Sequence, residues 1–145
     1  QLTAYVYQNG GAVYSEDGSE KRRTTGVELL NNIDYKNLSV GLAVMLADVN
    51  YSNAGDIYLS AAYEHALPQD FALRTSVGGF IYNDRRDDGI VETAEHAVFS
   101  EARIGLAKAL GKTGAEAVLE YVWGGQDRMG ESLEDQTLIG LNYSF

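Results

Sequence analysis

Charged side chains inside segments that are otherwise small or apolar are the first candidates for chemistry in this sequence. Arg74 stands on an alternating face of small residues, and acidic residues share that face in neighbouring segments. If a three-residue turn joins the segments on either side, Leu67 lies opposite Phe71. Glu64 then lies opposite Arg74, and opposite charges on one face of a strand pair attract each other.

A second short turn gives a second pair. With Leu110 opposite Thr113, Arg103 lies opposite Glu120. Charges taken out of water must be paired, because the desolvation cost is otherwise severe. We therefore predict an ion-pair network on one face of the sheet, with the members Glu28, Glu64, Arg74, Glu101, Arg103, Glu116 and Glu120.

Such a network has two possible uses. As a structural element, it fills the interior of a narrow barrel, in which eight strands leave just enough room for side chains. As a functional element, it lines a narrow, gated pore. Five glutamates stand against two arginines in the network, so a pore of this kind would prefer cations.

One segment resembles a calcium-binding loop. Asp84, Asp88 and Glu95 occupy positions one, five and twelve of an EF-hand pattern. Arg86 stands at position three, where a ligand oxygen belongs, and the pattern predicts no flanking helices. A solvated hairpin tip with a turn-forming Asp-Gly pair explains the same residues, so we expect neither a metal nor another cofactor.

Strands are needed to position these faces, because their residues alternate with a period of two. In the segment NLSVGLAVML, Leu38, Val40 and Leu42 share one face, and small residues occupy the other. The segment SEARIGLAKALGK would also suit a short helix, but a strand continues the series of hairpins. The predicted strands are 2–14, 23–34, 37–50, 56–67, 71–83, 96–110, 113–124 and 134–145.

The connections between these strands alternate in length. Tight turns are predicted at 34–37, 68–70 and 111–112. Long polar loops are predicted at 15–23, 50–55, 83–95 and 124–135. With eight strands, all tight turns and both termini then lie at one end of the sheet, and all long loops lie at the other. This sorting is typical of barrels that cross an outer membrane.

Composition limits the possible functions. The 145 residues are enough for one domain, 1–145, and the net charge of −10 argues against nucleic acid as a partner. The chain has no Cys, so neither disulfides nor cysteine metal sites are possible. It begins with Gln1, which we interpret as a mature start after signal-peptide removal, although a simple segment boundary would look the same.

Two kinds of closed barrel fit eight strands with one apolar face. A lipocalin-like barrel turns that face inward, whereas a membrane barrel turns it toward lipid. Membrane barrels carry aromatic girdles at both interfaces. The apolar face has Tyr35, Tyr63, Phe71, Tyr143 and Phe145 near the tight-turn end, and Tyr121 and Trp123 near the long-loop end. We therefore predict an all-β fold, an eight-stranded antiparallel up-and-down transmembrane β-barrel with short periplasmic turns and longer extracellular loops.

The last residues, TLIGLNYSF, carry a resemblance. They alternate, with Ile139 and Leu141 leading to Tyr143 and the terminal Phe145. The chain resembles the small eight-stranded outer-membrane barrels of Gram-negative bacteria, of the OmpX and OmpA-barrel type, in architecture over its whole length. The resemblance implies that Tyr143 and Phe145 form a signal read by the barrel-assembly machinery.

The same resemblance implies a place and partners. It places the chain in the bacterial outer membrane, in contact with membrane lipids and lipopolysaccharide. The loops 83–95 and 124–135 are acidic, so divalent cations could bridge them to anionic lipopolysaccharide. We expect a structural or interaction role through these loops, with an unidentified protein partner as one possibility. The alternative is a narrow cation-preferring channel.

A further alternative is a lipid-modifying enzyme, because some small outer-membrane barrels act on lipid A. Only His65 and His96 could serve as imidazole bases, and Ser100 shares the face of His96. Glu120, a possible orienting group, points to the other face. The segment NYSNAG resembles the His-x-Ser-Asn segment of lipid A deacylases, but Asn50 stands where the His belongs. We therefore expect no enzyme and interpret the two histidines as interfacial residues.

Overall fold

The protein is built from β-strands. Its computed structural model describes residues 2–7, 12–14, 20–23, 26–84 and 91–143. No helix that could cross a membrane occurs among them. The strands are β1 (Leu2–Tyr7), β2 (Ala12–Tyr14), β3 (Glu20–Arg23), β4 (Gly26–Tyr35), β5 (Leu38–Met45), β6 (Ile57–Leu67), β7 (Phe71–Ile81), β8 (Ala97–Ala109), β9 (Ala115–Gly124) and β10 (Gln136–Tyr143).

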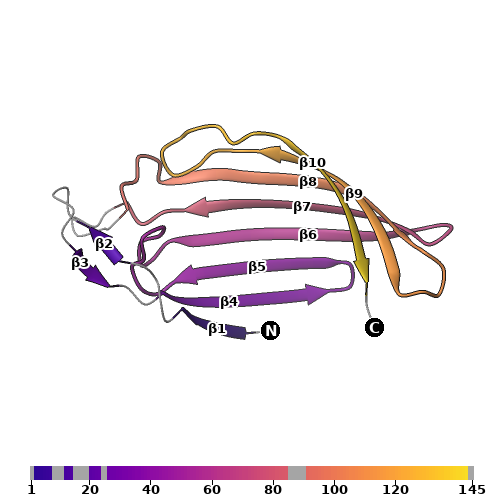
Figure 1. Cartoon of the computed structure of the whole chain (residues 1–145), viewed down its shortest axis with the longest axis horizontal. Coiled ribbons are helices and arrows are strands. Elements are labelled where there is room, and N and C mark those ends of the chain that lie inside the picture. Colours follow the sequence, from indigo (N-terminus) through magenta and orange to yellow (C-terminus); the bar gives the residue numbers. More distant parts are fainter. Residues whose placement is uncertain (1, 8–11, 15–19, 24–25, 85–90, 144–145) are drawn as a thin grey trace.

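Eight of these strands form one antiparallel sheet, in the order β1-β4-β5-β6-β7-β8-β9-β10 (Figure 1). This up-and-down arrangement confirms the predicted all-β fold and the series of hairpins. The segment SEARIGLAKALGK (100–112), which also suited a helix, belongs to strand β8 as far as Ala109. The long connections lie at the end of the sheet that carries β2 and β3, and the tight turns lie at the other end (Figure 1).

The first predicted strand, 2–14, is wrong in its length. Tyr7 is the last residue of β1, and its partner Gly26 is the first residue of β4, so β4 has no residue left to pair with a longer strand. The chain instead uses β2, which pairs with β3 in a small separate sheet. β3 lies within 15–23, which the sequence pattern assigned to a loop.

The sheet has two edges, β1 and β10. Among the described residues, each of these strands pairs with one neighbour, and no ladder joins them. The sheet is strongly curved, with β9 and β10 turned across the view (Figure 1). The described strands therefore form an open, curved sheet, and closure into a barrel is not part of this arrangement.

The two faces of the sheet differ sharply. On the apolar face, Leu42 opposes Leu59 and Leu119 opposes Ile139. Side chains of this face are exposed, up to 86 % for Ile139 and 67 % for Ile33. The few fully buried residues lie instead on the opposite, polar face, such as Ala107, or in the loops, such as Val49. No described element covers the apolar face.

The turns set the registers. Leu67 opposes Phe71 as predicted, across a turn in which Gln69 and Asp70 have positive φ. The predicted pairing of Leu110 with Thr113 is wrong, because the amide of Leu110 donates to the carbonyl of Ala115.

The turn between β8 and β9 is wider than predicted because it passes through Gly111 and Gly114, both with positive φ. As a result, Arg103 opposes Val122, and Glu120 opposes Gly105. The register differs from the prediction by two residues, a shift that leaves every side chain on its predicted face.

Candidate functional site

The first cluster on the polar face surrounds Arg74. Its Nε donates to Glu64, its direct cross-strand partner, at 2.7 Å. Its two terminal nitrogens donate to the two oxygens of Glu116 at 2.7 and 2.9 Å. Glu116 lies on β9, so the guanidinium reaches across β8. Gly105, which opposes Arg74 on β8, presents no side chain in the way.

The second cluster surrounds Arg103. It contacts Glu101, two residues earlier on its own strand, at 2.7 Å and Glu120 at 3.2 Å. The predicted Arg103–Glu120 ion pair therefore forms, but as a diagonal contact rather than between directly opposed residues. Arg103 and Arg74 keep side-chain exposures of 37 % and 36 %. Both clusters are thus in partial contact with solvent.

A hollow of about 520 Å³ lies over these clusters, lined by Glu64, Arg74, Glu101, Arg103 and Glu120 together with smaller residues. Tyr58 also lines it and donates to Glu101 at 3.4 Å. The ring of Tyr58 lies over Gly78, where any Cβ would overlap it. This explains why a small residue is required at the centre of β7.

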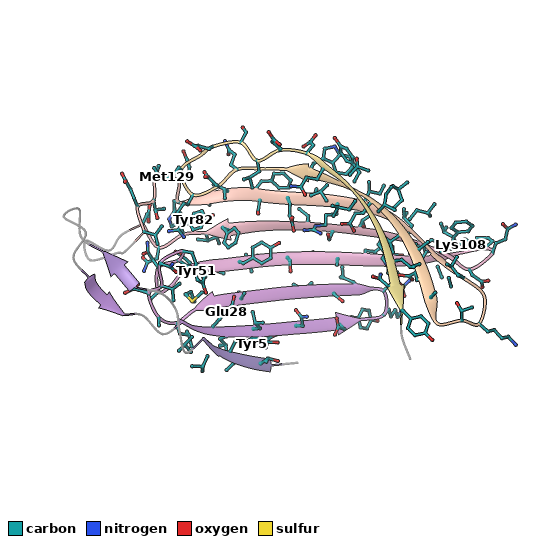
Figure 2. The ribbon with its side chains drawn as sticks, in the orientation of Figure 1. Tyr5, Glu28, Tyr51, Tyr82, Lys108 and Met129 are labelled. Atoms are coloured by element: carbon teal, nitrogen blue, oxygen red, sulfur yellow. The ribbon has the colours of Figure 1, made fainter. Side chains whose placement is uncertain are left out.

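Glu28, the remaining member of the predicted network, lies toward the loop end. It is opposed by Tyr5 and Met45 on the polar face. It lines a second hollow of about 240 Å³ with Tyr51 and Tyr82, and all three labelled side chains lie toward the end that carries β2 and β3 (Figure 2). The predicted network is therefore divided along the sheet, with two arginine clusters and a separate glutamate.

The loop end also contains a cluster that sequence reasoning missed. Asp56, whose side chain is 3 % exposed, accepts hydrogen bonds from the Ser52 hydroxyl at 2.7 Å and the Asn53 amide at 2.8 Å. It also accepts from the Asn83 amide at 2.9 Å and from Arg128 at 2.6 Å. Burial alone would raise the pKa of Asp56, but these hydrogen bonds outweigh it and hold the pKa below its ordinary value of 3.8.

This cluster joins three long loops. The side-chain amide of Asn53 exchanges two hydrogen bonds with the backbone of Val91, at 2.8 and 2.9 Å. Arg128 donates to Thr93 at 3.1 Å and lies over the ring of Tyr82 at 4.5 Å. We call Asn53, Asp56, Asn83 and Arg128 the loop hub. Its partners lie up to 72 residues apart in the chain, so no local pattern indicated it.

The predicted aromatic girdles are placed as follows. Tyr35, Tyr63 and Tyr143 are exposed on strands that meet the tight-turn end, where Lys108 lies over the ring of Phe71 at 4.1 Å. Tyr121 and Trp123 pack edge to face at 5.0 Å toward the loop end. Phe99, opposite Gly79, adds an exposed ring to that second band. Phe145 lies outside the described residues, so its part in the predicted assembly signal has no structural counterpart here.

The remaining candidates are dispersed. Of the predicted calcium ligands, Asp84 lies 3.0 Å from the imidazole of His96. The backbone amide of Glu95 donates to the backbone carbonyl of Arg128. Asp88 lies outside the described residues. In the described part of the chain, no group of three or more His, Cys, Asp or Glu side chains could hold a metal ion. His65 stacks near Tyr63 at 6.4 Å.

No family model matches the chain, and searches of curated proteins and of solved structures found no similar protein. Function must therefore be argued from the two faces of the sheet and from the loop hub.

Proposed function

We propose that this protein is an eight-stranded transmembrane β-barrel of the bacterial outer membrane that closes when it inserts. One observation carries the proposal: apolar side chains are exposed on one face of the sheet, and the charged side chains of its described strands, apart from Lys108 at the tight-turn end, occupy the other face. Lipid would cover the apolar face, and closure would enclose the charges.

Dimensions support this proposal. A membrane-crossing β-strand needs about 9–11 residues, and β6 and β7 have 11 residues each. On the apolar face of these two strands, Leu59 and Val77 are exposed, and Tyr63 and Phe71 stand toward the tight-turn end, as expected for strands that meet a membrane interface there. A soluble protein of this size would leave an unusually large apolar surface in water.

The role that we propose is structural or interactive, through the long loops. The loop hub joins the described parts of three of them through hydrogen bonds of Asn53 and of the buried Asp56. The surface of these loops is acidic, with Asp48, Glu92, Glu95, Asp127, Glu131 and Glu134 among its residues. Lipopolysaccharide bridged by divalent cations, or a basic protein partner, fits this charge.

A narrow cation-preferring channel is the second candidate. The hollow of about 520 Å³ favours it, because the polar face is not filled by side chains. Three glutamates and two arginines line that hollow. If it extends through the closed barrel, its net negative charge would favour cations.

Refolding tests the membrane proposal. We expect the protein to aggregate in plain buffer, to fold in detergent micelles or lipid vesicles, and to migrate differently on gels before and after heating. A folded, monodisperse sample in plain buffer would overturn the proposal. Planar-bilayer recordings of the folded protein then separate the two roles, since the interaction role predicts no steady conductance and the channel predicts cation-selective steps.

A further inference from the structure

The two edge strands of the sheet are β1 and β10. We propose that these two strands pair with each other in a single register, in which Tyr5 lies opposite Gly140. The inference rests on the proposed function, because it specifies the seam by which the sheet closes in a membrane. It names which residues meet at that seam, which barrel architecture alone does not fix.

The edge formed by β10 needs a partner in lipid. All eight residues of this strand are exposed, among them Leu141 at 71 %. An edge strand presents backbone N–H and C=O groups along one side, and hydrocarbon offers nothing to bond them. The other edge of the same sheet, β1, carries the complementary row of groups.

The ladders fix how far the two edges are displaced. One row of directly opposed residues crosses the sheet from β10 to β4: Thr137, Tyr121, Ile104, Thr75, Tyr63, Leu38 and Tyr35. Leu2 pairs with Asn31, which precedes Tyr35 by four positions. β10 runs in the same direction as β4, so the same offset of four positions before Thr137 leads to Leu133. Leu2 therefore lies level with Leu133 before any stagger is added.

Barrel geometry supplies the stagger. Eight strands close with a tilt of about 35–45°. With a rise of about 3.3 Å per residue and about 4.8 Å between strands, a stagger of about ten residues gives a tilt of about 41°, near the middle of that range. Ten residues beyond Leu133 is Tyr143. A stagger of ten residues in the opposite direction would place Leu2 level with Trp123, which lies on β9 and not on the edge strand. We therefore pair Leu2 with Tyr143.

This register passes three checks. Leu2 and Tyr143 are the outermost residues of their strands at the tight-turn end, so both strands end together. Val6 meets Ile139 and Ala4 meets Leu141, and all four belong to the apolar face.

The third check concerns the polar face, where Tyr5 meets Gly140. A Cβ at Gly140 would have no atom within 4 Å, so the position has room for a ring. Tyr58 already covers Gly78 in the same way on this face. An aromatic ring across from a strand glycine restores the contacts that the glycine lacks. Tyr5 thus completes the wall that surrounds the hollow.

Cysteine cross-linking tests the register, because the natural chain has no Cys. We expect Tyr5→Cys/Gly140→Cys, folded in lipid vesicles and oxidised, to form a disulfide within one molecule. Two matched pairs are displaced by two residues, Tyr5→Cys/Leu138→Cys and Tyr5→Cys/Asn142→Cys, and should react at least about tenfold more slowly because their Cβ atoms are too far apart. Val6→Cys/Ile139→Cys repeats the test on the apolar face without changing Tyr5.

The outcomes are distinct. Fast cross-linking of a displaced pair overturns the register, and cross-links between two molecules overturn the intramolecular seam. If no pair reacts although gels show a folded, heat-modifiable protein in lipid, the pairing of β1 with β10 is wrong while the membrane proposal stands. If the cysteine-free protein is folded and monodisperse in plain buffer, the membrane proposal itself fails, whatever the cross-links show.

Discussion

At the scale of single residues, the two arginines of the polar face differ in how firmly they are held. Arg74 donates two hydrogen bonds to Glu116, at 2.7 and 2.9 Å. Arg103 donates one to Glu120, at 3.2 Å. Two parallel charge-assisted hydrogen bonds give a stronger and more directional contact than one. Both arginines are about one-third exposed, so solvent screens both contacts.

Double-mutant cycles measure this difference. We expect Arg103→Met with Glu120→Leu to show a coupling of about 1 kcal/mol or less, and Arg74→Met with Glu116→Leu to show a larger one. Both cycles are read by urea unfolding in lipid vesicles. Arg74→Lys is the control, because it keeps the charge and loses the paired geometry. A coupling for Arg103 and Glu120 that equals or exceeds the one for Arg74 and Glu116 would contradict this ranking, and a coupling of about 3–5 kcal/mol would indicate a lumen without water.

At the scale of elements, the sequence predicted what depends on local periodicity. The period of two located β4 to β10 and assigned the charges to one face, because side chains in strands alternate strictly. The pairing of Glu64 with Arg74 followed from a three-residue turn. The predicted register of β8 and β9 was wrong by two residues. Gly111 and Gly114 have positive φ and widen that turn, and the sequence alone does not show how long such a turn will be.

The loop hub was beyond prediction for a different reason. Arg128 and Asp56 each stand in a polar loop with several other charges, and nothing local distinguishes them. Their contact exists because three hairpins bring their loops to the same end of the sheet. Non-local ion pairs of this kind follow from topology, so only the folded arrangement reveals them.

The loop hub should act as one cooperative unit. Asp56→Asn keeps the shape of the side chain but leaves the charge of Arg128, with 13 % side-chain exposure, without its counter-charge. Breaking one side of such a pair costs about 3 kcal/mol or more. Hydrogen exchange at the amides of Asn53 and Asn83 should rise accordingly. Glu131→Gln, a change at an exposed acid of the same loops, is the control and should leave both amides unaffected.

Acid should open the loops through the same residue. Because the pKa of Asp56 in the folded protein lies below its ordinary value of 3.8, the folded state binds fewer protons than the unfolded one. The stabilisation that the ionised Asp56 gives to the folded loops is therefore complete above pH 3.8, and it is lost as the pH falls through the lowered pKa of Asp56. The free energy of opening the loops, read from hydrogen exchange corrected for the intrinsic exchange rate at each pH, should fall below pH 3.8 and stay constant near pH 5. In Asp56→Asn this pH dependence should disappear, and a dependence that persists would assign it to another group.

At the scale of the whole molecule, the sorting of loops and faces defines an orientation. The long loops lie at one end of the sheet, and the tight turns lie at the other (Figure 1). The loop hub lies among the long loops, and Tyr121 and Trp123 stand toward the same end of β9. The net charge of −10 adds a solubilising surface at the loops, whereas the apolar face favours lipid. In the membrane barrel that we propose, the loop end would face the outside of the cell, the apolar band would face hydrocarbon, and the tight-turn end would face the periplasm.

Single-cysteine labelling tests this orientation. Met129, 43 % exposed in the loop between β9 and β10, and Lys112, exposed in the turn between β8 and β9, lie at opposite ends of the sheet. On intact cells, a maleimide carried on a large polymer should label Met129→Cys and not Lys112→Cys, because the polymer cannot cross the outer membrane. After the membrane is permeabilised, both should react. Labelling of Lys112→Cys alone on intact cells would reverse the orientation, and equal labelling of both on intact cells would show that the sheet does not cross the membrane.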